Sequence, residues 1–124
     1  MNLGIYSYLL TTLIFTGVIV ILELILLRKT LSKYRILISI MILISVIGTV
    51  IEEPPALATQ AWTYNLQDML NMHIFGAEIE TFVYSSLVMF CITGATLFFA
   101  DAEDGHVSFR KLILLRIKEA TRRW

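Results

Sequence analysis

Two carboxylates at the start of an apolar stretch, Glu78 and Glu80, are the residues best suited to chemistry. An ionised side chain near the centre of a bilayer costs at least about 2.5–3.5 kcal/mol, so a carboxylate there is a functional candidate. Glu80 shares one helix stripe with Tyr84 and Gly94, which would turn it into a helix bundle beside a tyrosine. Desolvation favours the protonated form of such a carboxyl group, which can protonate a weak base such as an alkene. Glu78 lies about 200° away around a helix, so we expect it to face elsewhere.

Three other carboxylates have simpler expected roles. Glu23 lies about one helical turn before Arg28, so we expect it to pair with Arg28 or Lys29 among the headgroups. Glu52 and Glu53 directly follow an apolar stretch. We expect them to be interfacial charges that mark the return of the chain to water or headgroups.

Residue types that bind metals or cofactors elsewhere form no specific motif in this chain. Cys91 is the only cysteine, which excludes an internal disulfide and a cysteine-based metal site. We expect His73 to be an interfacial histidine rather than a ligand. Neither G-x-G-x-x-G nor G-x-x-x-x-G-K occurs, so we expect no nucleotide or flavin and predict no cofactor. We expect a solvated acidic loop, and no metal, at the cluster formed by Asp101, Glu103, Asp104 and His106.

Three apolar stretches, residues 3–27, 36–51 and 75–100, must position these side chains. A content of 57% hydrophobic residues and a mean hydropathy of +0.77 exceed what a soluble domain of this size carries. We expect the second stretch to end before Pro54 and Pro55, because the residue before a proline disfavours helical geometry. The sequence therefore predicts an all-α membrane protein with three transmembrane helices in one domain, residues 1–105.

The C-terminal segment, residues 106–124, is too charged to cross a bilayer and is predicted to be an amphipathic helix. Its apolar residues recur at helical spacing, and basic residues occupy the other positions. The apolar set is Phe109, Leu112, Ile113, Ile117, Ala120 and Trp124, and the basic set is Arg110, Lys111, Arg116, Lys118, Arg122 and Arg123. Such a helix is expected to lie at the membrane interface and to bind anionic lipid.

The basic residues also predict an orientation. Every lysine and arginine lies in residues 28–35 or in the C-terminal segment, and positive charge collects on the cytoplasmic side. Three crossings then place the N-terminus outside, the C-terminus in the cytoplasm and residues 52–73 outside, in a multi-pass protein of the cell membrane. The formal net charge is zero, so we expect no nucleic-acid partner.

Two short segments resemble a known family. They are residues 61–65, Ala-Trp-Thr-Tyr-Asn, and residues 74–81, Ile-Phe-Gly-Ala-Glu-Ile-Glu-Thr, followed by the aromatic residues Phe82 and Tyr84. Together they resemble the membrane lycopene cyclase domain, whose pattern is W-x-Y-N, a spacer and I-x-G-x-P-I-E-E. Glu78 stands at the proline of this pattern, and Thr81 stands at its second glutamate.

The resemblance implies that the chain is one three-helix half of an enzyme that closes the ends of a linear carotenoid into rings without net redox change. It implies that Glu80, with Glu78 as a further candidate, is the acid that protonates the terminal double bond. Trp62, Tyr64 and Asn65 carry over from the W-x-Y-N motif and are expected, with Tyr84 beside Glu80, to bind the substrate. The expected partners are a lipid-soluble carotenoid or other isoprenoid and a second three-span subunit, either a different chain or a second copy.

Two other functions fit the same residues. The missing second glutamate is also consistent with a non-catalytic membrane subunit or scaffold. Carboxylates inside a membrane also carry protons, so Glu23 or Glu80 could serve a small proton-coupled transporter that becomes complete on oligomerisation.

Overall fold

The computed structural model describes residues 4–122, without the side chains of Ile5, Leu66 and Phe109. Three helices in this part of the chain are long and apolar enough to cross a membrane: α1 (Ser7–Leu26), α3 (Arg35–Ala58) and α4 (Ile79–Asp104). Short elements connect them: η1 (Gly4–Tyr6), α2 (Arg28–Lys33), η2 (Leu66–Asp68), β1 (His73–Ile74) and β2 (Ala77–Glu78). A further helix, α5 (Phe109–Thr121), closes the described chain.

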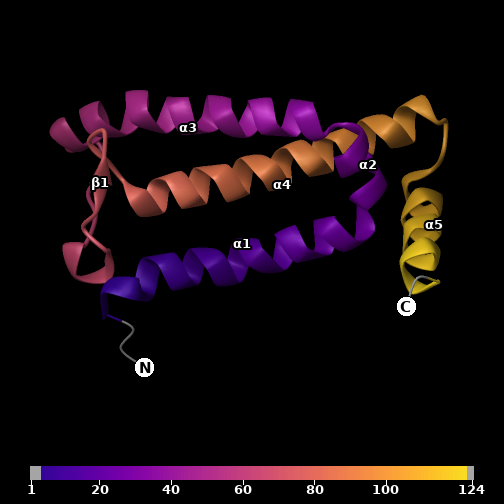
Figure 1. Cartoon of the computed structure of the whole chain (residues 1–124), viewed down its shortest axis with the longest axis horizontal. Helices are drawn as coiled ribbons and strands as arrows, with labels where there is room; N and C mark the ends of the chain where they lie inside the picture. Colours follow the sequence, from indigo (N-terminus) through magenta and orange to yellow (C-terminus); the bar gives the residue numbers. More distant parts are fainter. Residues whose placement is uncertain (1–3, 123–124) are drawn as a thin grey trace.

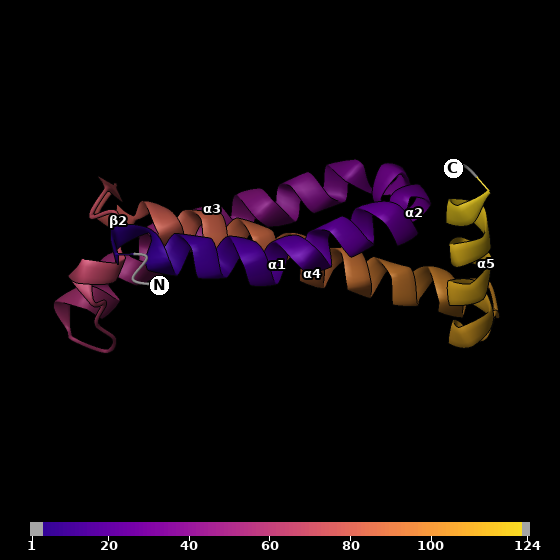
Figure 2. The same cartoon turned by 90° about the horizontal axis from the view of Figure 1, so that it is seen from below.

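The three long helices lie side by side with α4 between α1 and α3, and α5 runs across one end of them (Figure 1, Figure 2). We call this end the basic end; it holds the end of α1, α2, the start of α3, the end of α4 and α5. We call the opposite end the hairpin end, where the start of α1, the end of α3, the strands β1 and β2, and the start of α4 meet (Figure 1). The prediction of an α-helical chain with three apolar spans and an additional C-terminal helix is confirmed.

The apolar surface of the molecule faces outward. Phe15 on α1 is 71% exposed and Ile36 on α3 is 71% exposed, as expected of helices whose solvent is lipid rather than water. The buried core is small and lies toward the basic end, where Leu27, Leu31 and Phe98 pack together with Ile38. The three helices therefore indicate a membrane protein, in which lipid covers what the bundle leaves exposed.

The ends of the helices differ from the prediction in three places. The second span does not stop before Pro54, because α3 continues through both prolines to Ala58. Thr59 closes its last turn by donating to the Pro55 carbonyl from the backbone N–H at 3.0 Å and from the hydroxyl at 2.8 Å. Prolines are tolerated in membrane helices where neighbouring groups stabilise the interrupted backbone, and the extension keeps Glu53 on an ordered helix.

The third span begins and ends later in the chain than predicted. The link between the first two spans contains a helix, α2. Phe75 and Gly76 form the turn between β1 and β2 with positive φ, so α4 begins only at Ile79. At its other end the expected acidic loop is wrong, because Asp101 to Asp104 form the last turn of α4. Asp101 there accepts hydrogen bonds from the hydroxyls of Thr30 and Tyr34 at 2.8 and 3.1 Å. It also pairs with Lys33 of α2 at 2.8 Å.

The C-terminal helix divides its apolar residues between two environments. Leu112 and Ile113 pack against the core, whereas Ile117 is 42% exposed. The predicted stripe also included Trp124 and the basic set included Arg123, and both lie outside the described residues, as do Met1 and the first residue of the predicted span, Leu3.

Candidate functional site

The hairpin end buries three carboxylates, Glu53, Glu78 and Glu80, which we call the carboxylate cluster. Their exposed fractions are 1%, 2% and 0%. Glu53 comes from the penultimate turn of α3, Glu78 from β2 and Glu80 from the first turn of α4. Three segments that are separate in the sequence therefore deliver the same functional group to one buried region.

The strand pair explains why Glu78 is buried. His73 pairs with Glu78 across the two antiparallel strands, and the Ile79 N–H donates to the Met72 carbonyl at 2.9 Å. Glu78 has extended backbone angles and precedes α4, so the prediction that it faces away from Glu80 around a helix is wrong. Its backbone N–H lies 3.5 Å from Glu53 Oε1, at the limit of a hydrogen bond, and its side chain interacts electrostatically with both Glu53 and Glu80.

In each carboxyl group of the cluster, only one of the two oxygens has a hydrogen-bond or ion-pair partner in the described chain. Glu80 Oε1 accepts the Leu70 N–H at 2.5 Å, and Glu53 Oε1 accepts the Thr81 hydroxyl at 2.9 Å. Glu78 Oε1 lies 2.8 Å from His73 Nε2. The second oxygen of all three is buried and has no hydrogen-bond partner among the residues that the structure describes. Buried polar atoms usually have a partner, so three such atoms in one cluster mark a site that a proton or a ligand completes.

Burial and the neighbouring carboxylates favour a proton on Glu78. Burial raises the pKa of Glu78, and the interactions with Glu80 and Glu53 raise it further, whereas His73 opposes the shift. Like charges that are removed from water disfavour simultaneous ionisation. A protonated carboxyl group can donate a proton and a carboxylate can take one back, which is the chemistry that a cluster of carboxyl groups offers.

Two tyrosines, Tyr8 and Tyr64, interact with carboxylates of the cluster. The Tyr64 hydroxyl lies 3.2 Å from that of Thr81, and burial raises the pKa of Tyr64. The rings of Tyr64 and Tyr8 meet edge to face, with centroids 6.3 Å apart. Tyr8 in turn interacts electrostatically with Tyr84, which is 44% exposed. Aromatic rings at these positions can stabilise a cation through their faces.

The structure gathers some of the predicted site residues and leaves others outside. Glu78 and Glu80 belong to the carboxylate cluster, Tyr64 lies beside it, and Tyr84 lies about one turn of α4 beyond Glu80. Trp62 is 44% exposed on the preceding loop. Asn65 is engaged locally, because its side chain caps η2 by accepting the Gln67 N–H at 3.3 Å and also donates to Asp68 at 2.7 Å.

Three members of the site were not predicted from the sequence: Glu53, Thr81 and Tyr8. A signal for Glu53 exists, because Ser45, Thr49 and Glu53 recur every four residues and form a polar stripe on α3. The stripe faces α4: Ser45 donates to the Ser85 carbonyl at 3.2 Å and Thr49 to the Ser85 hydroxyl at 3.0 Å. A polar stripe in a membrane span indicates the face that packs against another helix.

A fourth buried carboxylate lies away from the cluster. Glu23 on α1 is 8% exposed and does not pair with Arg28 or Lys29, so that prediction is wrong; Lys29 pairs with Glu119 instead. Glu23 Oε2 has no hydrogen-bond partner within the described chain and packs against Gly94, where a Cβ atom would overlap it. The same carboxylate lines an apolar cavity of about 170 Å³ beside Phe98.

Among residues 4–122, no group of three or more His, Cys, Asp or Glu side chains is arranged to hold a metal ion. No protein-family model, curated protein or solved structure matches this chain.

Proposed function

We propose that this chain is a subunit of a carotenoid-type cyclase, in which the carboxylate cluster supplies the proton that starts ring closure. The observation that carries the proposal is the burial of Glu53, Glu78 and Glu80 together, each with one oxygen that has no hydrogen-bond partner in the described part of the chain. Four of the six residues that the family resemblance and the helix stripe assign to the site also lie in or near this cluster.

The cyclisation conserves atoms and electrons. The Glu80 carboxyl group transfers its proton to the inner carbon of the terminal double bond, which leaves a tertiary carbocation at the outer carbon. A second double bond of the same chain attacks that cation and forms the ring. A carboxylate of the cluster then removes a proton from a ring carbon and restores a double bond, so the product is an isomer of the substrate.

The other residues around the cluster are assigned supporting roles. The faces of the Tyr8, Tyr64 and Tyr84 rings stabilise the cation, each by about 0.5–2 kcal/mol. Glu53 supplies the carboxylate that the resembled family carries at the position of Thr81. The Thr81 hydroxyl donates a hydrogen bond to Glu53 at 2.9 Å. This contact supports the assignment, because the Glu53 carboxylate lies beside the position at which the resembled family has its second glutamate.

The proposal includes an arrangement in the membrane. The carboxylate cluster lies toward the outer face of the cell membrane, whereas residues 28–35 and α5 lie on the cytoplasmic face, since all ten lysine and arginine residues fall in residues 28–35 and 106–124. A lipid-soluble isoprenoid reaches the site from within the bilayer. A second three-span subunit, either another chain or a second copy, completes the binding site.

Pigment analysis tests this function. The chain is coexpressed with its partner subunit in bacterial cells that accumulate a linear carotenoid, and cyclic products are quantified by chromatography. Glu80→Gln is expected to lower ring formation by about 100-fold or more, because it removes the general acid. Glu53→Gln is expected to lower it as well, if less severely.

The matched control is Glu103→Gln, which makes the same chemical change at an exposed position on the same helix and is expected to retain activity. All variants are checked by gel filtration in detergent, so that loss of folding is recognised. Normal ring formation by a folded Glu80→Gln protein would contradict the catalytic role and would favour a non-catalytic subunit or scaffold.

One contact favours proton-coupled transport as a second candidate. His73 is half-exposed and pairs with the buried Glu78 at 2.8 Å, which connects water to the carboxylate cluster. Proteoliposomes that contain a pH-sensitive dye would distinguish the two functions. Proton flux that is lost in both Glu78→Gln and Glu80→Gln, in the absence of any carotenoid, would support the transporter.

A further inference from the structure

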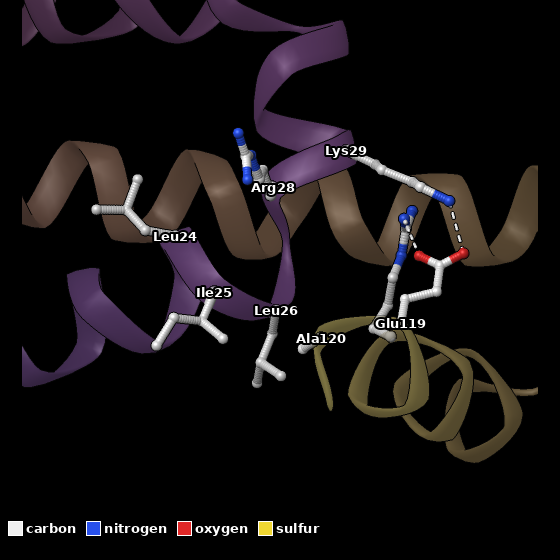
Figure 3. Close-up of a pocket in the computed structure, with 8 residues that line it drawn as sticks. Leu24, Ile25, Leu26, Arg28, Lys29, Glu119 and Ala120 are labelled. Carbon is white, nitrogen blue, oxygen red and sulfur yellow. Dashed lines mark hydrogen bonds and ion pairs between the residues drawn. The ribbon is translucent and has the colours of Figure 1, made fainter. Parts of the chain in front are cut away.

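The basic end contains a cavity of about 280 Å³ between the end of α1, the start of α2 and α5 (Figure 3). Four of its eight lining residues are apolar and four are charged. The apolar residues are Leu24, Ile25, Leu26 and Ala120, and the charged residues are Arg28, Lys29, Arg116 and Glu119.

The charges in this cavity are not balanced. Glu119 pairs with Lys29 at 2.5 Å and with Arg116 at 3.5 Å, and Figure 3 shows the Lys29 ammonium reaching the Glu119 carboxylate. Arg28 has no ion pair with any residue between positions 4 and 122, and its side chain points away from Glu119 in Figure 3. Three cations against one carboxylate leave two positive charges in excess, which is a site for an anion.

The apolar half of the lining indicates which anion. Leu24 and Ile25 are 51% and 47% exposed, and the exposed apolar surface continues along α1 through Ile21, which is 58% exposed. A free phosphate ion would use only the charged half of the cavity. A phospholipid uses both halves, because its acyl chain can follow α1 while its phosphate contacts the cations.

The excess positive charge also distinguishes among phospholipids. The cationic group of a phosphatidylcholine headgroup would add a third positive charge beside Arg28 and Lys29. A glycerol headgroup adds none, so the lipid keeps its net negative charge. The cavity therefore favours an anionic phospholipid.

We propose that this cavity binds one anionic phospholipid, with the phosphate at Arg28 and Lys29 and an acyl chain along Leu24 and Ile25. The lipid contacts α1, α2 and α5 and therefore fastens α5 to the bundle. This binding site is independent of the carboxylate cluster, which lies at the other end of the helices (Figure 1). Its test is therefore separate from that of the proposed function.

Native mass spectrometry of the full chain, purified in detergent, measures the binding directly. The protein is titrated with phosphatidylglycerol and with phosphatidylcholine of identical acyl chains, and we expect the first to bind about tenfold more tightly. Glycerol phosphate, which has the headgroup chemistry without acyl chains, is added as a competitor and is expected not to displace the lipid.

Arg28→Gln is expected to weaken phosphatidylglycerol binding about fivefold or more, and Lys29→Gln is expected to weaken it too. Arg110→Gln is the matched control, because it removes the same charge from an exposed position of α5 outside the cavity, and it is expected to leave binding within about twofold. Melting temperatures in detergent show whether each variant is folded.

Three results would overturn the proposal. Equal binding of the two lipids would show that the headgroup charge is not recognised. An equal loss in Arg110→Gln and Arg28→Gln would show diffuse attraction by surface charge instead of a defined site. Displacement by glycerol phosphate would show an anion site that does not use the apolar half of the cavity.

Discussion

The two ends of the bundle differ in how their charged side chains are buried and paired. At the hairpin end, Glu53, Glu78 and Glu80 have the same sign, are buried and keep one oxygen each without a hydrogen-bond partner in the described chain. At the basic end, Asp101 pairs with Lys33 and Glu119 pairs with Lys29, although the buried Glu23 pairs with neither Arg28 nor Lys29. Burying like charges costs stability, whereas exposed pairs of opposite charge contribute little either way. The costly arrangement is the one that indicates function.

The pH dependence of stability should show the largest difference between the ends. Burial raises the pKa of Glu78 above its ordinary value near 4.5, so folding favours its protonated form. The stabilising contribution is complete below pH 4.5 and is lost as the pH rises through the raised value. The free energy of unfolding of the wild type should therefore fall, relative to Glu78→Gln, by up to about 1.4 kcal/mol per pH unit.

Unfolding of the wild type and Glu78→Gln in detergent, followed from pH 4 to pH 8, measures this difference. Glu52→Gln is the control, because Glu52 is the exposed neighbour of Glu53 and its replacement should leave the pH profile unchanged. A constant difference between wild type and Glu78→Gln across the whole range would contradict the burial of Glu78. Replacing His73 as well should extend the fall to higher pH, because His73 opposes the shift.

The smallest effect is expected for an ion pair at the basic end. Lys29 and Glu119 have side chains that are 54% and 45% exposed, so solvent screens their attraction. Lys29→Gln in lipid-free detergent should lower the free energy of unfolding by less than about 1 kcal/mol. A loss above about 2 kcal/mol, measured by the same unfolding method, would show that the two ends differ less than their exposure indicates.

The sequence predicts the helices better than it predicts the carboxylate cluster. Hydropathy over about twenty residues identifies α1, α3 and α4, because each span must satisfy its own backbone in lipid. The predicted end of α3 was wrong. The rule for residues before proline considers only the local backbone, whereas the contacts of Thr59 and the packing of Glu53 depend on the surrounding structure. Helix spacing correctly predicted that the Glu80 side chain points into the bundle. The prediction held because Glu80 does lie in the first turn of α4.

The burial of Glu78 could not be predicted from sequence patterns. Its burial depends on a turn in which Phe75 has a φ of 52°, a conformation that a phenylalanine does not signal. Only the meeting of β2 with α3 and α4 makes it a neighbour of Glu53 and Glu80. Glu53 was within reach of prediction, since its polar stripe with Ser45 and Thr49 is present in the sequence.

The protonation state of the carboxylate cluster tests the account most directly. Infrared spectroscopy at neutral pH detects the carbonyl stretch of a protonated carboxyl group, which shifts on exchange into deuterated water. We predict that the wild type shows this band and that it weakens in the folded triple variant Glu53→Gln, Glu78→Gln and Glu80→Gln, but not in Glu103→Gln. A band of equal intensity in the wild type and the triple variant would mean that the cluster holds no proton, which would contradict its proposed role as an acid.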